Sequence, residues 1–221
     1  MKNLLLIITA LMLIVGCSSP EPINYETTLV KRDGVFYTND TNEPYSGKVF
    51  SLYEDGEKKD EGTLKDGKMI SKTEWKWYSN GQKRYEETYK DGSLDGLWTN
   101  WYSNGQKQLE GSYKGVGVYD NPEKDRVFRG PEKDGKWTRW YSDGKKRFEE
   151  TYKDGKKEGL QTYWYENGQK EQEITFKDDE KDGLWTAWYE NGQKIFEATF
   201  KDGDLISEKC WDEDGNERVC N

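Results

Sequence analysis

Residues 183–192 read GLWTAWYENG and residues 96–105 read GLWTNWYSNG, so one ten-residue pattern occurs twice in the same chain. Its second half, Trp-Tyr-X-Asn/Asp-Gly, begins at Trp77, Trp101, Trp140, Trp164 and Trp188, with spacings of 24, 39, 24 and 24 residues. Weaker copies begin at Leu52 and Trp211. Self-similarity at a period of roughly 20 to 50 residues is the signature of a repeat protein.

Each repeat carries two turn signals. Asn-Gly or Asp-Gly between alternating aromatic and polar residues indicates a β-hairpin, because type I′ turns need positive φ. A second signal, as in Lys90-Asp91-Gly92, passes the chain to the next hairpin. The sequence therefore predicts an all-β fold: an elongated, single-layer antiparallel meander of tandem β-hairpin repeats that grows by two strands, about 10 Å, per repeat. A closed barrel or propeller is the alternative, although nothing in the sequence marks closure.

The composition excludes several classes of function. Only 32% of the 221 residues are hydrophobic and 35% are charged, but 10 Trp, 15 Tyr and 7 Phe are more aromatic residues than disordered chains carry. The formal net charge of -9 disfavours nucleic acid as a partner. The chain has no histidine, the commonest general base and zinc ligand. We therefore predict no nucleic-acid partner, no cofactor and no metal site.

The N-terminus has the pattern of an export signal. Lys2 precedes an apolar run, Leu4 to Val15, that is too short to span a bilayer comfortably. The run ends in Gly16-Cys17-Ser18, which resembles the bacterial lipobox. This resemblance implies a signal peptide over 1–16, a lipidated Cys17, a tether over 17–28 and a repeat domain over 29–221. An uncleaved signal anchor or a plain secretory signal is the alternative. The expected location is the cell membrane or outer membrane, lipid-anchored and facing the periplasm or exterior.

The repeated residues, such as those from Gly96 to Gly105 and from Gly183 to Gly192, resemble the MORN repeat in its bacterial variant. The resemblance covers about residues 29–217. Bacterial proteins of this kind are often named YwqK-type antitoxins of toxin-antitoxin systems, a name that implies binding and neutralising a protein toxin. The resemblance identifies a fold well and a function poorly.

The aromatic ladder supplies the candidate partner-binding residues: Trp77, Trp101, Trp140, Trp164, Trp188, Tyr78, Tyr102, Tyr141, Tyr165 and Tyr189. One interpretation is structural, with rings that stack along the sheet and replace a core. The other is functional, with a row of exposed rings that grips a peptide strand or a sugar chain. Which set of rings faces solvent depends on whether the hairpin loops contain two or three residues.

A charged ladder accompanies the rings. The second residue after each turn glycine is lysine (Lys83, Lys107, Lys146, Lys170 and Lys194), and the fifth is glutamate (Glu86, Glu110, Glu149, Glu173 and Glu197). The pattern favours a solvated charged face. Catalytic residues normally depart from a repeat pattern, whereas these acids recur at the same position in every repeat. We predict no catalytic residue and no enzyme.

Two irregular segments complete the prediction. About 15 extra residues lie near 115–131, between Trp101 and Trp140, and could form a binding arm or a plain loop. Cys210 and Cys220 could form a disulfide in an oxidising compartment, with two free thiols as the alternative. A three-residue loop over 214–216 would pair residue 213 with 217 and place Cys210 directly opposite Cys220.

These observations favour a membrane-anchored extracytoplasmic repeat lipoprotein that acts as a protein-interaction scaffold. An antitoxin-like protein that neutralises a toxin is one alternative. A cell-wall or glycan-binding module that uses the aromatic ladder is another.

Overall fold

The computed structural model describes residues 20–115 and 130–220. The predicted signal peptide, the lipidation site Cys17 and most of the insertion at 115–131 lie outside the described residues.

The described chain contains one short helix, α1 (Tyr25–Thr28), and eighteen strands. The strands are β1 (Ile23–Asn24), β2 (Leu29–Arg32), β3 (Val35–Thr38), β4 (Gly47–Leu52), β5 (Lys58–Lys65), β6 (Lys68–Trp77), β7 (Lys83–Lys90), β8 (Ser93–Trp101), β9 (Lys107–Lys114), β10 (Glu132–Trp140), β11 (Lys146–Lys153), β12 (Lys156–Lys157), β13 (Gly159–Trp164), β14 (Lys170–Lys177), β15 (Glu180–Trp188), β16 (Lys194–Lys201), β17 (Asp204–Trp211) and β18 (Glu217–Arg218).

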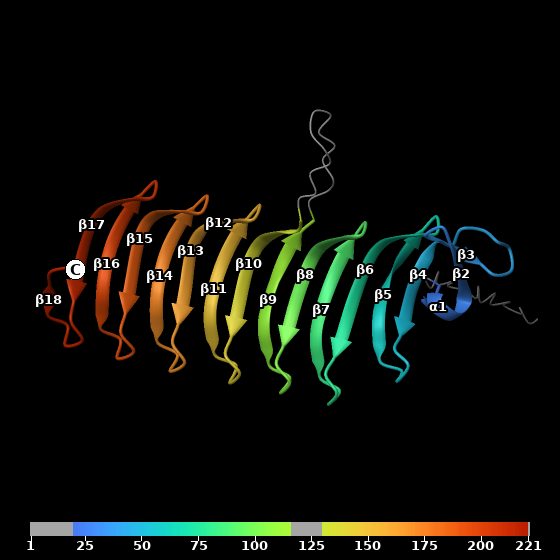
Figure 1. Cartoon of the computed structure of the whole chain (residues 1–221), viewed down its shortest axis with the longest axis horizontal. Coiled ribbons are helices and arrows are strands. Elements are labelled where there is room, and N and C mark those ends of the chain that lie inside the picture. Colours follow the sequence, from blue (N-terminus) through green and yellow to red (C-terminus); the bar gives the residue numbers. More distant parts are fainter. Residues whose placement is uncertain (1–19, 116–129, 221) are drawn as a thin grey trace, which may run out of the picture.

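Sixteen of these strands form one open sheet (Figure 1). From β4 to β18 the strands follow one another in chain order, with β12 beside β11, and neighbours pair antiparallel. Strands β2 and β3 form a separate hairpin at the N-terminal end. The predicted fold, an elongated antiparallel meander without barrel closure, is confirmed.

The two sides of the meander use different turns. On the lower side in Figure 1, three-residue loops join the strands, as where Tyr78 and Gln82 flank residues 79–81 and Gly81 has φ 79°. On the upper side, two-residue turns such as Asp91-Gly92 have positive φ at both residues, 48° and 81°. The type I′ geometry is therefore found at the two-residue Asp-Gly turns. The Asn-Gly and Asp-Gly signals of the other side, such as Asn80-Gly81 and Asp143-Gly144, form three-residue loops, the alternative that the sequence left open.

The asparagine explains the three-residue loop. Asn80 Oδ1 accepts a hydrogen bond from the Gln82 amide at 3.1 Å, which holds the loop with positive φ at the glycine alone. Asn80 Nδ2 also donates to the Ser103 carbonyl of the next repeat at 2.7 Å. Three more asparagines make the same link to the following loop: Asn104, Asn167 and Asn191. Each of these four turns is thus tied to its successor.

The N-terminal end of the sheet is capped. β1 pairs parallel with β4, and α1 and the β2–β3 hairpin pack beside it around buried Leu29, Val49 and Leu64. Tyr25 of α1 donates to Asp60 at 2.9 Å. The tether predicted over 17–28 is therefore too long, because residues 23–28 belong to the folded body and a two-residue strand leaves no periodicity in the sequence.

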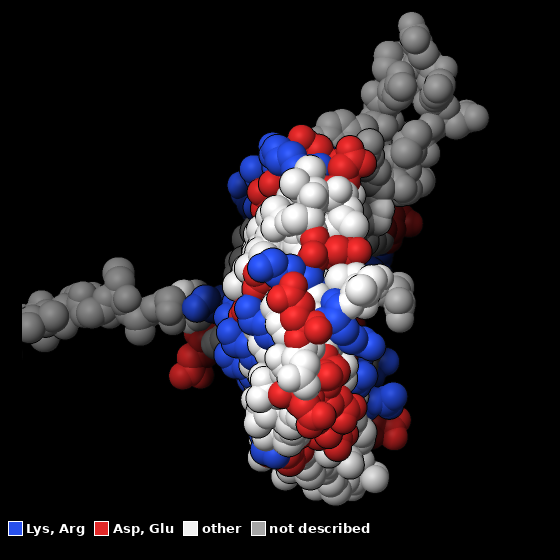
Figure 2. Space-filling model, turned by 90° about the vertical axis from the view of Figure 1, so that its left-hand side faces the viewer, with Lys and Arg blue, Asp and Glu red and all other residues white. Residues whose placement is uncertain are grey.

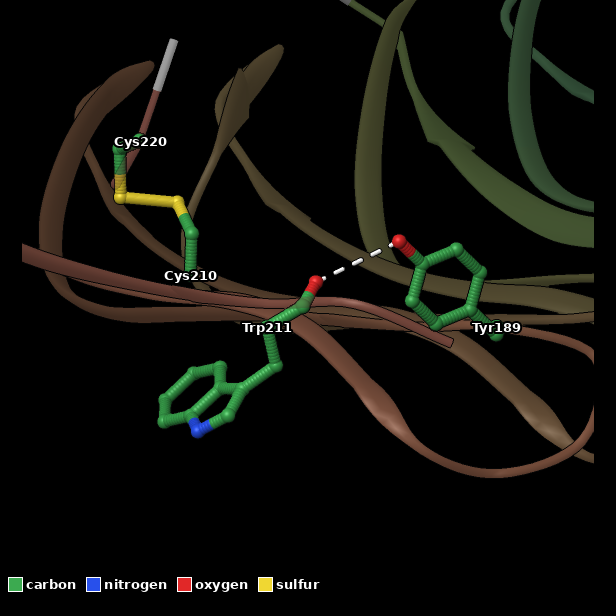
Figure 3. The surroundings of a disulfide bond; sticks show 4 residues. All are labelled: Tyr189, Cys210, Trp211 and Cys220. Atoms are coloured by element: carbon green, nitrogen blue, oxygen red, sulfur yellow. Dashed lines mark hydrogen bonds between the residues drawn. A yellow bond between two sulfur atoms is a disulfide. The ribbon is translucent and has the colours of Figure 1, made fainter. Parts of the chain in front are cut away.

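The C-terminal hairpin is closed by a disulfide between Cys210 and Cys220 (Figure 3). Cys210 pairs with Arg218 and Trp211 pairs with Glu217, so the predicted register, in which Cys210 faces Cys220, is wrong. The loop lies over 213–215, one residue earlier than predicted, because Asp212 bonds to Asn216 across it. The disulfide therefore joins Cys210 to a residue two positions beyond its directly opposite partner, Arg218.

A thin layer of side chains takes the place of a core. Trp137, only 1% exposed, lies across Gly111, where an added Cβ would approach the indole to 2.2 Å. Among the other fully buried side chains, Leu64 and Val49 lie under the N-terminal cap, and Thr99 and Gln161 in the repeats are polar. In the end-on view the body is a narrow slab with acidic and basic side chains interspersed on its surface (Figure 2).

Candidate interaction surface

One face of the sheet carries the ladder that the sequence predicted, and we call it the ladder face. Glu110 pairs with Thr99 on one side and Thr138 on the other, and this alternation continues to Glu197. Paired residues share a face and side chains alternate along a strand, so the tryptophans two positions after each threonine lie on that face too. The ladder face thus carries Trp101, Trp140, Trp164, Trp188 and Trp211 beside the five lysines and five glutamates named above.

Each lysine of the ladder face extends to the tryptophan of the next repeat. The Nζ atom of Lys83 lies 5.5 Å from the ring centroid of Trp101, and that of Lys146 lies 5.7 Å from the Trp164 centroid. The pairs Lys107–Trp140, Lys170–Trp188 and Lys194–Trp211 repeat this contact. Contacts of this kind are cation–π interactions, which hold the rings and the ammonium groups in one continuous row.

Every lysine also pairs with the glutamate three residues later. The Nζ–carboxylate distances are 3.0 Å for Lys83–Glu86, 2.7 Å for Lys146–Glu149 and 2.6 Å for Lys170–Glu173. Although burial raises the pKa of Glu149, the ammonium groups of Lys136 and Lys146 outweigh it and hold that pKa below its ordinary value. The row is therefore a chain of alternating charges at fixed positions.

Leucines extend the ladder face towards the two-residue turns. Leu97, Leu160 and Leu184 precede buried threonines by two residues and are 41%, 53% and 47% exposed. Lys136 takes the same place on β10, where it pairs with Thr151. Seen across the strands, the face presents a band of rings and lysines, a band of threonines and glutamates, and a band of exposed leucines.

The predicted ladder residues are not equivalent. The five predicted tryptophans are half-buried, and Trp77 differs from the rest because its Nε1 donates to the Lys58 carbonyl at 2.9 Å. Sequence reasoning omitted Trp211 from the ladder, although its weak repeat copy was visible. Trp75, which pairs with Glu86 on the ladder face, carries both Lys58 and Lys83, at 5.5 and 5.8 Å from its centroid. The row of lysine-bearing rings therefore begins at Trp75 and ends at Trp211.

The predicted tyrosines serve the fold. Each lies just after a strand and donates its hydroxyl to the backbone carbonyl of the next repeat's tryptophan, as Tyr78 does to Trp101 at 2.8 Å and Tyr165 to Trp188 at 2.7 Å. Tyr102, Tyr141 and Tyr189 make the same bond. Burial raises the pKa of Tyr141 and Tyr165. These hydroxyls hold neighbouring repeats together.

The opposite face, which we call the aromatic face, is more closely packed. Trp98 and Tyr113 contact Trp137, with ring centroids 5.9 and 4.9 Å away. Trp185 packs against Phe196 and Phe200. Aromatic pairs of this kind give a single-layer sheet the burial that a core would otherwise supply.

Two acids on the aromatic face, Glu87 and Glu150, occupy a position that is not acidic in the other repeats. Glu150 is buried and accepts hydrogen bonds from Tyr163 at 2.5 Å and Tyr152 at 2.7 Å, with Lys157 at 3.3 Å. Burial raises the pKa of Glu150, but these partners outweigh burial and lower it overall. Sequence reasoning missed this group because it attended to the neighbouring Glu149. The signal was available, since the equivalent positions hold Gly111, Ile174 and Ala198 in three strands and an acid only in β7, where Glu87 accepts from Tyr89 and Trp98.

A cleft of about 710 Å³ lies where the N-terminal cap meets the aromatic face. Its apolar lining includes Leu29, Phe36 and Met69, and Lys72 and Glu74 stand at its edge as an ion pair. Sequence reasoning did not find it, because it forms between segments that only the fold brings together.

Within 20–115 and 130–220, no helix has the length and apolar character needed to cross a membrane. Across those same ranges, no set of three or more His, Cys, Asp or Glu side chains is grouped to hold a metal ion.

Comparison with known families identifies the repeats. The family model described as MORN repeat variant matches five segments, at residues 74–91, 94–114, 133–154, 157–178 and 181–202. No curated protein sequence matches the chain. Each matched segment contains one Asn-Gly or Asp-Gly loop of the three-residue kind.

Proposed function

Because this chain carries five repeats of the MORN variant family, we propose that it is a lipid-anchored extracytoplasmic scaffold that binds a protein partner on its ladder face. MORN repeats are generally involved in protein or membrane interactions. To this we add a lipid anchor, an extracytoplasmic location, the ladder face as the binding surface and a protein as the partner.

The observation that carries the proposal is the regular row of rings and charges on the ladder face. Tryptophans are among the residues that contribute most to binding at protein interfaces, and charges placed beside them give specificity. The exposed leucines beside the row add apolar area that a partner can cover. A row of this kind suits an extended partner that contacts several repeats, each contributing little alone.

Two features support an extracytoplasmic location. Disulfides persist in oxidising compartments, and the Cys210–Cys220 disulfide fits an exported protein. The lipobox-like residues ending in Cys17 supply both an export signal and an attachment point. We therefore propose that the protein is anchored at the cell membrane or outer membrane through Cys17.

The ladder favours a protein partner over a glycan. A sugar stacks on the face of an aromatic ring, and here a lysine ammonium already lies over each ring from Trp101 to Trp211. An antitoxin role would also use a protein partner, but it would require the chain to meet its toxin in the cytoplasm, whereas an anchored chain faces away from it. We propose no catalytic role for the chain.

The anchor is tested by fractionating cells that express the full chain or its Cys17→Ala variant. We expect the natural chain in the membrane pool with incorporated radiolabelled palmitate, and the variant without label. If both copies stay in the soluble cytoplasmic pool and capture a toxin-like protein, the anchor is wrong and the antitoxin reading takes its place.

The binding face is tested with a photo-crosslinking residue at one of two positions on β8. Leu97 lies on the ladder face and Asn100 on the aromatic face, so the two probes share a strand and differ in direction. We expect a discrete crosslinked protein from position 97, lost in a Trp101→Ala/Trp140→Ala background, and none from position 100. Equal crosslinking from both positions would contradict a binding face.

A further inference from the structure

The two ends of the long sheet are finished differently. At the N-terminal end, β1, α1 and the β2–β3 hairpin cover β4. At the C-terminal end, β17 is eight residues long, but β18 pairs only with Cys210 and Trp211. Among the described residues, the outer edge of β17 from Asp204 to Lys209 therefore has no strand beside it.

This edge is exposed along its whole length. All six residues from Asp204 to Lys209 are exposed, including Leu205 at 50% and Ile206 at 63%. Interior strands of the same repeat, such as β15, bury several residues each. An uncovered edge strand with apolar side chains is a template for pairing with another strand.

The disulfide keeps the chain's own tail away from the edge. Cys210 lies on the aromatic face, because it pairs with Phe196. Its bond to Cys220 holds Cys220 on that face, opposite to the side on which the Trp211 ring lies in Figure 3, and β18 ends at Arg218. The described tail therefore does not extend along β17 towards Asp204.

The surroundings of the edge are acidic. From Asp204 to Val219 there are six acids and two basic residues, a net charge of -4 from six minus two. The acids are Asp204, Glu208, Asp212, Glu213, Asp214 and Glu217, and the bases are Lys209 and Arg218. Acidic side chains gather at this end of the molecule in Figure 2. A second copy of the chain would bring an equally acidic edge, whereas a basic segment would be attracted.

We propose that the outer edge of β17, residues 204–209, binds an extended segment of a partner protein that alternates basic and apolar residues, adding it to the sheet as one more strand. The partner's backbone pairs with the free amides and carbonyls of β17. Its apolar side chains lie on the aromatic face over Leu205, which pairs with Phe200. Its basic side chains lie on the ladder face beside Asp204, which pairs with Lys201. This site is separate from the ladder face and does not depend on the function proposed for that face.

The test uses the purified full chain in detergent and two synthetic peptides, Ac-KVKVKVKV-amide and Ac-EVEVEVEV-amide. We expect the lysine peptide to bind and to slow hydrogen exchange of the backbone amides in 204–209. The glutamate peptide should do neither. A lysine peptide with every second backbone nitrogen methylated should fail to bind, because it cannot pair as a strand. Equal binding of the methylated peptide would reduce the contact to charge attraction alone and overturn the proposal.

Two matched variants locate the site. Ile206→Lys adds a positive charge on the edge itself, and we expect it to weaken binding of the lysine peptide by about tenfold or more. Leu184→Lys adds the same charge at an exposed leucine of an interior strand, 47% exposed, and should leave binding unchanged. Equal losses in both variants would place the peptide elsewhere.

Light scattering on the same samples tests a second copy as the occupant. If the peptide-free chain is a dimer whose 204–209 amides are already protected, and Ile206→Lys makes it monomeric, the edge binds its own copy and the proposal is wrong. Crosslinking from position 97 reads out the ladder face independently, so failure at one site is distinguishable from failure at the other.

Discussion

At the scale of the residue, the tyrosine that follows each ladder tryptophan makes one hydrogen bond to the next repeat. We expect Tyr165→Phe to lower the free energy of unfolding by about 1 kcal/mol, because it leaves the Trp188 carbonyl without this donor. Urea denaturation monitored by circular dichroism measures the change. Tyr37→Phe is the control, since the Tyr37 hydroxyl has no hydrogen-bond partner among the described residues. Equal losses in the two variants would contradict a specific role for the inter-repeat bond.

Glu150 makes the stability of the repeats depend on acid. Its folded-state pKa lies below the ordinary value of 4.5, so its stabilising contribution is present above that pH and is lost as pH falls through the folded pKa. We expect Glu150→Gln to destabilise the protein above pH 4.5 and to flatten the loss of stability below it. Unfolding free energies on both sides of that pH measure this, with the exposed Glu208→Gln as control. An unchanged acid dependence would show that Glu150 does not contribute to it.

The sequence predicted the positions of the ladder residues. It did not predict that the tryptophans carry the lysines while the tyrosines hydrogen-bond to the next repeat. Trp164 and Tyr165 are adjacent and both aromatic, so composition treats them alike. The hydroxyl of Tyr165 reaches a carbonyl 23 residues away only because the loops contain three residues, and loop length could not be fixed from Asn-Gly alone. Glu150 was missed for a different reason: one of its two tyrosine partners, Tyr163, meets it from the next strand.

At the scale of the element, the two-residue turns require positive φ at a residue with a side chain. Asp202 has φ 48°, which aspartate tolerates and a β-branched residue does not. We expect Asp202→Val to lower the free energy of unfolding by about 1 to 2 kcal/mol. Ser79→Val is the control, because Ser79 is an exposed loop residue outside the positive-φ set. Thermal and urea denaturation of both variants measure the difference, and similar losses would mean that backbone strain is not the cause.

The element level was the most predictable from sequence. Alternating aromatic and polar residues placed the strands, and Asp-Gly turns such as Asp202-Gly203 have the predicted type I′ geometry. The length of the other loops could not be chosen from the dipeptide. The side chains of Asn80 and Asp143 each accept from the amide two residues on and so form three-residue loops. At the last hairpin the three-residue loop was predicted one residue too late, which made the predicted register at Cys210 wrong.

At the scale of the whole molecule, contacts link each repeat mainly to its neighbours, so a local change should have a local effect. Closing a loop of about ten residues with a disulfide stabilises by about 3 kcal/mol in the chain-entropy model. We expect the Cys210→Ser/Cys220→Ser double variant to lose hydrogen-exchange protection in β17 and β18 while β10 and β11 stay unchanged. Loss of protection throughout the sheet would mean that the repeats unfold as one cooperative unit.

The overall shape followed from the repeat, whereas the N-terminal cap did not. Leu29, Val49 and Leu64 form its buried cluster, yet they come from segments that match no repeat and carry little periodicity. A parallel pairing of two residues, Ile23 with Val49 and Asn24 with Phe50, is too short to be read from sequence. Non-repeating ends therefore need the structure, while the body between them does not.

The inter-repeat bonds of tyrosine and asparagine have a consequence for how such a gene changes over generations. Tyr141 and Tyr165 bond to carbonyls 23 residues ahead, so any unit of 24 residues offers the same donors and acceptors at both of its borders. Duplication or loss of one unit would leave every remaining border satisfied. The protein can therefore become longer or shorter by whole repeats, and relatives of different length should differ by complete repeats within the array.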